Sequence, residues 1–195
     1  MRAEDVPAVV DVHLRAFSGF FLSFLGARFL ALLYRAAIEL DEIALVADVA
    51  GRVTGFVMGT ADPSGFLRQL LRSRFLEFAI AACPAIVRRP RATLRVARAV
   101  RKPATARKSA GTATLMSLAV DPLFQTRGQG RLLVEEFVAQ SSVRGAFRVD
   151  LTTDKYGNDG VNAFYIAMGF RVDREITTPE GRVLYEYVLN FAAPG

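Results

Sequence analysis

The second half of the chain alternates between patterns typical of strands and of helices, and few folds accommodate that alternation. Thr112 to Val120 is patterned as a strand, Gly128 to Gln140 as a helix and Phe147 to Thr153 as a second strand. In the last of these, apolar and polar side chains alternate, as they do on the two faces of a strand. Asn158 to Met168 is then patterned as a helix. This order predicts an α/β fold with a mixed central sheet flanked by helices.

Two opening helices and two further strand pairs complete the pattern. Val6 to Phe17 and a segment that follows Gly26 carry apolar residues at helical spacing. The strand pairs are Ile43 to Val49 with Val53 to Thr60, and Phe170 to Ile176 with Val183 to Phe191. With 195 residues, 52% of them hydrophobic, the chain can bury one sizeable core. We therefore expect a single domain over residues 1–195 with a mixed, mostly antiparallel sheet.

The excess positive charge of the chain lies in one internal segment. Residues 61–110 hold twelve basic and two acidic residues, a net charge of +10, whereas the whole chain carries +6. The remainder is mildly acidic, so the segment is interpreted as a basic insert in the α/β body. Its pattern predicts two helices, Phe66 to Ala82 and Pro84 to Val100, followed by a polar linker from Lys102 to Gly111.

Three roles stay open for this insert. It could be a helical lid whose arginines bind an anionic substrate, a basic surface that rests on anionic lipid, or a solvated structural hairpin. The lid is the favoured interpretation. Nucleic acid is the less favoured partner, because the basic charge belongs to the insert and the body is mildly acidic.

The scarcity of cysteine and histidine excludes several classes of protein. Cys83 has no partner for an internal disulfide and His13 has no second histidine for a zinc site, so no metal is expected. Both are interpreted as packed side chains, His13 with partial exposure as an alternative, and not as catalysts. Glu4 and Asp5 do not suit a signal peptide, and the apolar run Phe75 to Val87 is too short to span a bilayer. A cytoplasmic location is therefore expected.

A glycine-containing turn follows the strand that ends at Val120. Asp121-Pro122 turns the chain, and Gln125-Thr126-Arg127-Gly128-Gln129-Gly130 then opens a helix. Glycines permit close approach of the backbone to a ligand, and the N–H groups at a helix start favour an anion such as a pyrophosphate. Arg127 and Arg131 can add charge-assisted contacts. The turn is neither a dinucleotide fingerprint, which needs a third glycine, nor a P-loop, which ends in Gly-Lys-Ser or Gly-Lys-Thr.

The pattern Gln-x-x-Gly-x-Gly after a strand ending in Val-Asp-Pro resembles motif A of the GNAT acetyltransferase superfamily. The segment from Asn158 to Phe170, with its helix bearing Tyr165 and its Gly169-Phe170 entry to a strand, resembles motif B of the same family. The opening helices and the first strand pair suit the family's N-terminal half, so the resemblance covers most of the chain outside the insert. The sequence departs from the family at the insert and at the start, where only Met1-Arg2-Ala3 precede the first helix in place of a strand.

The resemblance implies acetyl-CoA as cofactor and a place for each part of it. The pyrophosphate would lie on Gln125, Thr126, Arg127, Gly128, Gln129, Gly130 and Arg131. The pantetheine arm would lie where two strands splay apart, Thr112 to Val120 and Phe147 to Thr153, bonded to the backbone at Leu118 and Val120. The N–H of Leu118 or Ala119 would polarise the thioester carbonyl. Asn158 would hold the arm from the other side.

Tyr165 and Asp154 are the implied catalytic residues. Tyr165 would lie near the thioester sulfur, and a tyrosine of ordinary pKa, about 10, is protonated at neutral pH and can donate to the departing thiolate. Asp154, at the end of a strand, is the candidate base for the acceptor amine. Glu39, Glu42 and a water chain to bulk solvent stay open as alternatives. Direct transfer requires no covalent enzyme intermediate.

The resemblance also implies where the acceptor binds. In the family it lies against the first two helices and their connection, here Phe17 to Gly26, whose four phenylalanines predict either an aromatic wall for a sugar or flat ring or a hydrophobic plug under the insert. We expect an N-acetyltransferase for a primary amine of a small molecule, with an amino sugar or nucleotide-linked amino sugar as candidate. The alternative is a catalytically weak acetyl-CoA-fold sensor whose insert binds nucleic acid or anionic membrane. Peripheral membrane contact through residues 61–110 and a homodimer also stay open.

Overall fold

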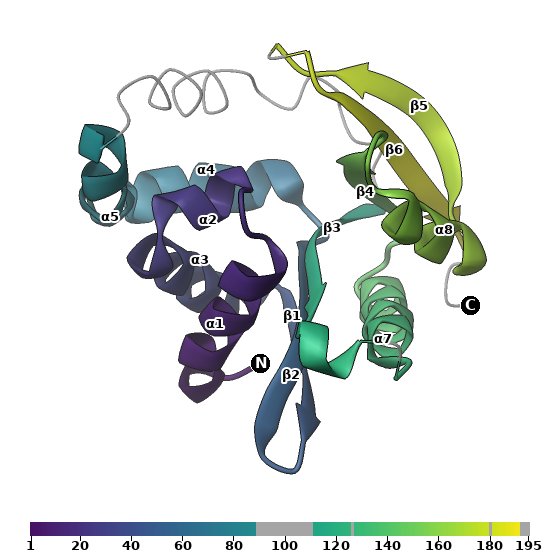
Figure 1. Cartoon of the computed structure of the whole chain (residues 1–195), viewed down its shortest axis with the longest axis horizontal. Coiled ribbons are helices and arrows are strands. Elements are labelled where there is room, and N and C mark those ends of the chain that lie inside the picture. The colour runs from purple at the N-terminus through teal and green to yellow at the C-terminus, as the bar shows by residue number, and fades with distance from the viewer. Residues whose placement is uncertain (89–110, 126, 180, 192–195) are drawn as a thin grey trace.

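One sheet that mixes both pairing directions runs through the protein. The structure, a computed structural model, describes residues 1–88, 111–125, 127–179 and 181–191. Its strands are β1 (Ile43–Val49), β2 (Arg52–Thr60), β3 (Thr112–Val120), β4 (Arg148–Asp154), β5 (Arg171–Thr177) and β6 (Val183–Asn190). These described strands lie in the order β1-β2-β3-β4-β6-β5, and the β3–β4 pair alone among them is parallel. The prediction of a mixed, mostly antiparallel sheet is confirmed (Figure 1).

The parallel strands β3 and β4 are paired at one end and separate at the other. Thr112–Thr114 of β3 pair with Arg148–Asp150 of β4. Beyond these three pairs β3 continues to Val120 and β4 to Asp154, while each keeps its antiparallel partner on the other side. The two strands therefore diverge in the middle of the sheet, as the predicted splay requires.

Helices cover both faces of this sheet. α1 (Val6–Ala16) and α3 (Ala27–Glu39) lie on one side of β1 and β2, and α7 (Gln129–Val143) lies on the other. β2 is buried on both faces, because Phe56 and Met58 enter the core beneath α1 and α3 whereas Val57 enters the core beneath α7. α8 (Asp159–Ala167) contributes Tyr165 to the core on the α7 side. β2 thus contributes side chains to two separate cores, one on each face of the sheet.

The segment between α1 and α3 differs from the prediction. A loop was expected from Phe17 to Gly26, but residues Phe21–Leu25 form a short helix, α2. Gly26, with a φ of 91°, ends α2 and starts α3, a backbone conformation that glycine adopts without strain. Ahead of α1 the described residues form a short 3-10 turn (Ala3–Asp5) and no strand, and the Met1 amino group donates to the carbonyl of Ala44 on β1 (2.9 Å).

The helix boundaries predicted in the described part of the insert, at Phe66, Ala82 and Pro84, are wrong. α4 (Pro63–Ser73) begins before the expected Phe66, because the Asp62 carboxylate accepts a hydrogen bond from the N–H of Gly65 (2.9 Å) and caps the helix. α5 (Phe75–Arg88) runs through Pro84, which was expected to start a helix. Pro84 is exposed, so water can reach the carbonyl that loses its N–H partner. Cys83 beside it is exposed as well, so the prediction of a packed cysteine is wrong. Residues 89–110, with the rest of the predicted second helix and linker, lie outside the described residues.

The described part of the insert extends the layer formed by α1 and α3. The ring of Phe78 on α5 packs edge-on against Phe29 on α3, with 5.1 Å between ring centres, and the Arg74 guanidinium pairs with Glu39. Figure 1 shows α4 and α5 on the side of α2 and α3, with α7 and α8 across the molecule. α4 and α5 therefore lie beside the first helices and not over the start of α7.

Candidate functional site

Two cavities meet where β3 and β4 diverge. The first, called here the loop cavity, has a volume of about 690 Å³ and lies between Leu118–Val120 on β3, the start of α7 and α8. The second, the strand cavity, has a volume of about 320 Å³ and lies between Leu115–Leu118 on β3 and Leu151–Asp154 on β4. Four residues line both cavities: Phe17, Leu118, Val161 and Tyr165. The cavities are adjoining parts of one site that the splay opens.

The start of α7 presents backbone N–H groups to the loop cavity. Gly128 caps α7 with a left-handed backbone (φ 78°), and a Cβ added there would meet nothing within 4 Å. A Cβ at Gly130 would lie 3.6 Å from the ring of Phe164. The first N–H groups of an α-helix have no partner inside the helix and carry partial positive charge, which favours an anion. The two glycines keep this helix start accessible to such a ligand.

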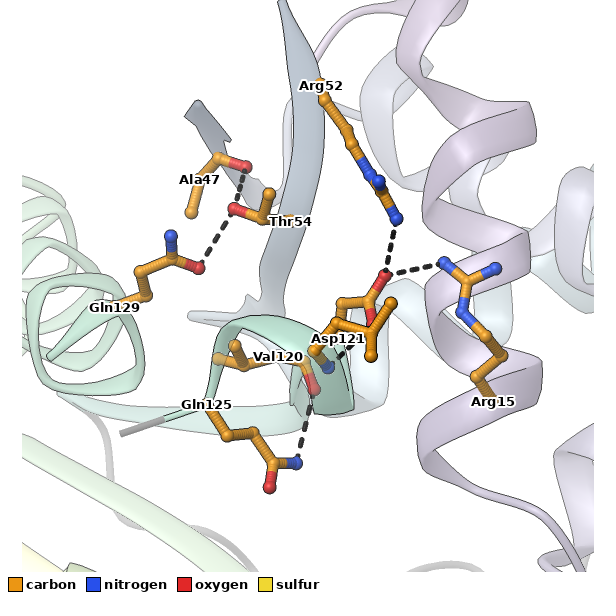
Figure 2. A network of polar contacts seen from close by, with 9 residues as sticks. Arg15, Ala47, Arg52, Thr54, Val120, Asp121, Gln125 and Gln129 are labelled. Atoms are coloured by element: carbon orange, nitrogen blue, oxygen red, sulfur yellow. Dashed lines mark hydrogen bonds and ion pairs between the residues drawn. The ribbon is translucent and has the colours of Figure 1, made fainter. Parts of the chain in front are cut away.

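Asp121 anchors the turn after β3 to the N-terminal half of the protein (Figure 2). Its buried carboxylate accepts hydrogen bonds from the N–H of Leu123 (3.1 Å) and from the guanidinium groups of Arg15 on α1 (2.9 Å) and Arg52 on β2 (3.3 Å). The Leu123 N–H first, and the arginines with it, hold the pKa of Asp121 below its ordinary value. A charged carboxylate thus fixes the end of β3 against α1 and β2.

Side-chain amides hold the two ends of the turn. The Gln125 amide donates to the Val120 carbonyl (3.4 Å), and Gln129 Oε1 lies 2.9 Å from the hydroxyl oxygen of Thr54 on β2 (Figure 2). Both glutamines still line the loop cavity. The Arg127 guanidinium is placed differently, 5.2 Å from the centre of the Phe124 ring. It therefore stacks on the turn and is not among the lining residues.

The structure gathers most of the residues that the resemblance assigned to the cofactor. The loop cavity is lined by these predicted residues: Leu118, Ala119, Val120, Gln125, Gly128, Gln129, Gly130 and Arg131. Asn158 and Asp154 line the strand cavity, and Tyr165 lines both. Thr126 lies outside the described residues. The ligand-binding roles of all these residues stay predictions.

Tyr165 lies in the wall that the two cavities share. Its ring is buried among the aromatic rings of Phe164, Phe170 and Tyr187, with ring centres 5.2, 5.5 and 5.9 Å away. Burial raises the pKa of the Tyr165 phenol well above its ordinary value. The hydroxyl is therefore protonated at neutral pH and can donate a hydrogen bond to negative charge that develops beside it.

The Asp154 carboxylate forms an ion pair with Arg182, which immediately precedes β6 in the β5–β6 hairpin. Arg182 Nη2 donates to Asp154 Oδ2 (2.6 Å), and Arg182 Nε donates to Asp154 Oδ1 (3.1 Å). The Arg182 guanidinium also lies 5.8 Å from the ring centre of Phe20. An amine that uses Asp154 as a proton acceptor must therefore do so beside a guanidinium group.

Two asparagines fix the turn between β4 and α8. Asn158 Nδ2 donates to the hydroxyl of Thr153 (2.6 Å), and Asn162 Nδ2 donates to the backbone carbonyl of Asp154 (3.2 Å). The hydroxyl of Tyr187 on β6 donates to Asn162 Oδ1 (3.2 Å). Asn162 was not singled out in the sequence, although its place one helical turn after Asn158 puts both on the same side of α8.

His13 borders the strand cavity, a position that the sequence interpretation did not assign to it. The side chain is buried, its Nδ1 lies 2.7 Å from the hydroxyl oxygen of Tyr34, and its Nε2 has no hydrogen-bond partner among the described residues. Burial lowers the pKa of His13 to about 4, so the imidazole is neutral at physiological pH. The prediction of a packed histidine agrees with its burial. His13 lies one helical turn before Phe17, which belongs to the segment predicted to bind the acceptor, and this spacing was the sequence signal that could have placed His13 at the cavity.

Three of the four phenylalanines expected between α1 and α3, namely Phe17, Phe20 and Phe24, divide between two places. Phe17 and Phe20 line the strand cavity. Phe24 packs with Leu25 against Ala82 of α5. Phe17 and Phe20 are therefore placed where the predicted aromatic wall would lie, and Phe24 where the predicted plug would lie, and contact of either with an acceptor stays a prediction.

The alternative acidic candidates lie elsewhere. Glu39 is paired with Arg74. Glu42 is half-buried, and burial raises the pKa of its carboxyl. Neither is among the described residues that line the two cavities. Within the described ranges no group of His, Cys, Asp and Glu is arranged to hold a metal ion, and no helix there has the length and apolar character needed to cross a membrane.

Comparison with known proteins agrees with this geometry. Residues 8–170 match the family model described as the acetyltransferase (GNAT) family. No curated protein sequence matches the chain significantly.

Solved structures of acetyltransferases share the fold. Ard1 from Thermoplasma volcanium is 17% identical, with a TM-score of 0.64 over 98% of this chain and 95% of that one. The ribosomal-protein-S18-alanine N-acetyltransferase from Escherichia coli is 17% identical, with a TM-score of 0.56 over 100% and 93%. The PaiA N-acetyltransferase from Thermoplasma acidophilum, in complex with coenzyme A, is 12% identical, with a TM-score of 0.58 over 98% and 96%. At these identities the likeness concerns the fold alone.

Proposed function

Because the chain belongs to the GNAT family of acetyltransferases, we propose that it transfers the acetyl group of acetyl-CoA directly to a primary amine of a small molecule. The observation that carries this proposal is the meeting of the loop cavity and the strand cavity at Tyr165. One cavity borders a helix start that favours an anion, and the other is lined by apolar side chains together with polar ones, Asp154 and Arg182 among them. Donor and acceptor can therefore approach each other on the two sides of one protonated hydroxyl group.

The residues of the loop cavity fit acetyl-CoA. Gly128 and Gly130 leave space at the start of α7 for a pyrophosphate, which the N–H groups there would bind. The backbone of Leu118–Val120 follows the last β3–β4 pair, so its edge toward β4 is available to the amide groups of a pantetheine arm. Asn158 lies across the splay, next to the end of β4.

Tyr165 and the β3 backbone would carry the chemical step. Acetyl-CoA, when bound, supplies a thioester carbon that a neutral amine can attack, with the thiol as leaving group. The Tyr165 hydroxyl, kept protonated by its burial, would donate a hydrogen bond at the position of the leaving sulfur. The same apolar surroundings make a sulfur anion more basic, which favours its protonation. An N–H of Leu118 or Ala119 would polarise the carbonyl.

Asp154 is the proposed acceptor of the proton that the amine must lose. It lines the strand cavity, on the side of Tyr165 away from the start of α7. Its bond to Arg182 keeps the carboxylate oriented at the end of β4. A chain of water molecules from the strand cavity to solvent is the alternative route for this proton.

Amino sugars, including nucleotide-linked ones, are the acceptor class we propose to test first. Phe17 and Phe20 supply aromatic surface that suits the apolar face of a sugar ring, and Arg182 lies beside Phe20. A panel of amines, amino sugars and peptides, followed by thiol release from acetyl-CoA, tests the proposal. We expect turnover with a small-molecule amine and a loss of about 10²-fold or more in kcat for Tyr165→Phe. Turnover with peptides alone contradicts the acceptor class, and acetyl-CoA binding without amine-dependent release favours the sensor alternative.

A further inference from the structure

The outer side of α5 is apolar and exposed. Phe75, Leu76 and Ile80 have 58%, 73% and 65% of their surface exposed. At about 100° per residue, these positions share one side of the helix with three other exposed and uncharged residues, Ala79, Cys83 and Pro84. We call these six residues the outer face of α5. A surface helix ordinarily turns polar residues to water, so this face is unusual for a helix that meets only solvent.

The opposite side of α5 is already packed on the protein. Phe78 contacts Phe29 of α3, and Ala82 lies in a small cluster with Leu25 of α2. Arg74, just before α5, pairs with Glu39 of α3. Figure 1 shows α5 at the periphery of the molecule. The inner side holds α5 in place, so the outer face is not needed to attach α5 to the described part of the protein.

Basic residues border this outer face. A groove of about 370 Å³ between α3 and α5 is lined by Arg28 and Arg35 of α3 and reaches Ile80. Both arginines are exposed. Glu77, the acidic residue in the same groove, lies 3.6 Å from the guanidinium of Arg74 and is paired with it. The groove therefore offers positive charge next to the exposed apolar side chains.

The sequence adds to this charge immediately after the helix. Residues 88–108 contain nine basic residues and no acidic residue. Apolar helical surface next to clustered basic residues is the combination that binds anionic bilayers, because side chains enter the acyl boundary while lysine and arginine contact lipid phosphates. An apolar protein partner would leave the exposed Arg28 and Arg35 beside the outer face without counter-charge.

We infer that the outer face of α5 docks on the surface of an anionic lipid bilayer. Phe75, Leu76 and Ile80 enter the boundary between headgroups and acyl chains, and Arg28 and Arg35 bind lipid phosphates beside them. The docking is peripheral, since no described helix has the length and apolar character to cross a membrane. It goes beyond acetyl transfer and does not depend on which amine is the acceptor.

Vesicle sedimentation with the full chain tests this inference. The wild-type protein is expected to bind vesicles that contain phosphatidylglycerol, less tightly as salt is added, and not to bind vesicles of phosphatidylcholine alone. Leu76→Ser with Ile80→Ser is expected to weaken binding at least about tenfold. Arg28→Gln with Arg35→Gln is expected to remove much of the preference for anionic lipid. Val143→Ser, at an exposed apolar position on α7, is the matched control and should bind like wild type.

Several outcomes would overturn the inference. Unchanged vesicle binding by a folded Leu76→Ser, Ile80→Ser variant is one, and the single Leu76→Ser change replaces it if the pair does not fold. Equal binding to neutral vesicles is another. A dimer that the same substitutions dissociate would make the outer face an interface between copies of the chain. Binding of duplex DNA without vesicle binding would assign the charge to nucleic acid. The assay needs no acetyl-CoA, so its failure is distinguishable from failure of the proposed activity.

Discussion

His13 on α1 and Tyr34 on α3 are joined by a hydrogen bond in the core beside the strand cavity, with 2.7 Å between Nδ1 and the hydroxyl oxygen. The Tyr34 hydroxyl is bonded in addition to Ser117 on β3. The imidazole is packed between the rings of Phe17 and Phe56, at 4.8 and 6.1 Å between ring centres. This chain of contacts links both opening helices to the strand that separates from β4.

The burial of His13 predicts that the protein loses stability in mild acid. Its pKa is lowered from 6.5 to about 4 in the folded protein, whereas the unfolded chain keeps the ordinary value. The unfolded state therefore binds the proton first as the pH falls below about 6.5. The free energy of unfolding should decrease between pH 6.5 and 4, by roughly 2–3 kcal/mol from this group alone. Urea denaturation at a series of pH values measures this slope.

A variant without a titratable group at this position provides the control. His13→Phe is expected to flatten the pH dependence in that range, even if its stability at neutral pH differs from wild type. Equal slopes for the two proteins would mean that His13 is protonated at its usual pH in the folded state. Tyr34→Phe keeps the histidine and should retain most of the slope.

The sequence predicted the strands more closely than the surroundings of the site. The bounds of β1 and β3 agree with the predicted Ile43 to Val49 and Thr112 to Val120, because alternation and flanking turns are local signals. The start of α4 was missed because it depends on one side-chain bond, from Asp62 to the N–H of Gly65. Local propensity alone does not distinguish an Asp62-Pro63 pair that caps a helix from one that only turns the chain.

The partners of the site residues could not be predicted from local pattern. Asp154 lies at the end of a predicted strand, but Arg182, which binds it, comes from the hairpin 28 residues later. His13 was placed on an apolar helix face, as predicted. That its ring borders a cavity follows from the divergence of β3 and β4, which is a property of the whole sheet. Motif spacing therefore located the residues around the loop cavity better than those around the strand cavity.

Two substitutions at Gly130 should separate effects on acetyl-CoA binding from effects on the stability of the fold. The Cβ position of Gly130 lies in ordinary contact with Phe164, at 3.6 Å, and no positive φ is required there. Gly130→Ala is expected to leave stability unchanged or raise it by about 0.5–1 kcal/mol, because alanine favours the helix. Gly130→Leu would extend into the loop cavity and raise KM for acetyl-CoA about tenfold or more, with a smaller change in kcat. Steady-state kinetics and thermal unfolding measure the two effects.

An exposed substitution on the same helix is the control for Gly130. Glu136→Leu changes an exposed position further along α7, whose side chain bonds to Gln140, and should leave KM for acetyl-CoA near the wild-type value. An unchanged KM in Gly130→Leu would contradict the placement of the cofactor against the start of α7.

Asp121 should contribute to stability through its charge. Asp121→Asn keeps the size of the side chain but removes the anion that Arg15 and Arg52 bind. Both arginines are about half exposed, so loss of either one alone should cost about 0–1 kcal/mol. The buried carboxylate also binds the N–H of Leu123, and its replacement should cost about 1–3 kcal/mol. Urea denaturation at neutral pH measures this difference, with the exposed Asp11→Asn on α1 as control.

The ion pair between Asp154 and Arg182 predicts different effects for its two members. Asp154→Asn removes the proposed proton acceptor, so kcat/KM for the amine should fall about 10²-fold or more at neutral pH. Part of this loss should be recovered at higher pH, where more of the amine is already neutral. Arg182→Gln keeps the carboxylate and should retain activity within about tenfold, with KM for acetyl-CoA unchanged in both variants. Full pH–rate profiles of the three proteins test this. Equal losses in both variants, without recovery at high pH, would show that Asp154 acts by holding the end of β4 in position and that the amine loses its proton by another route.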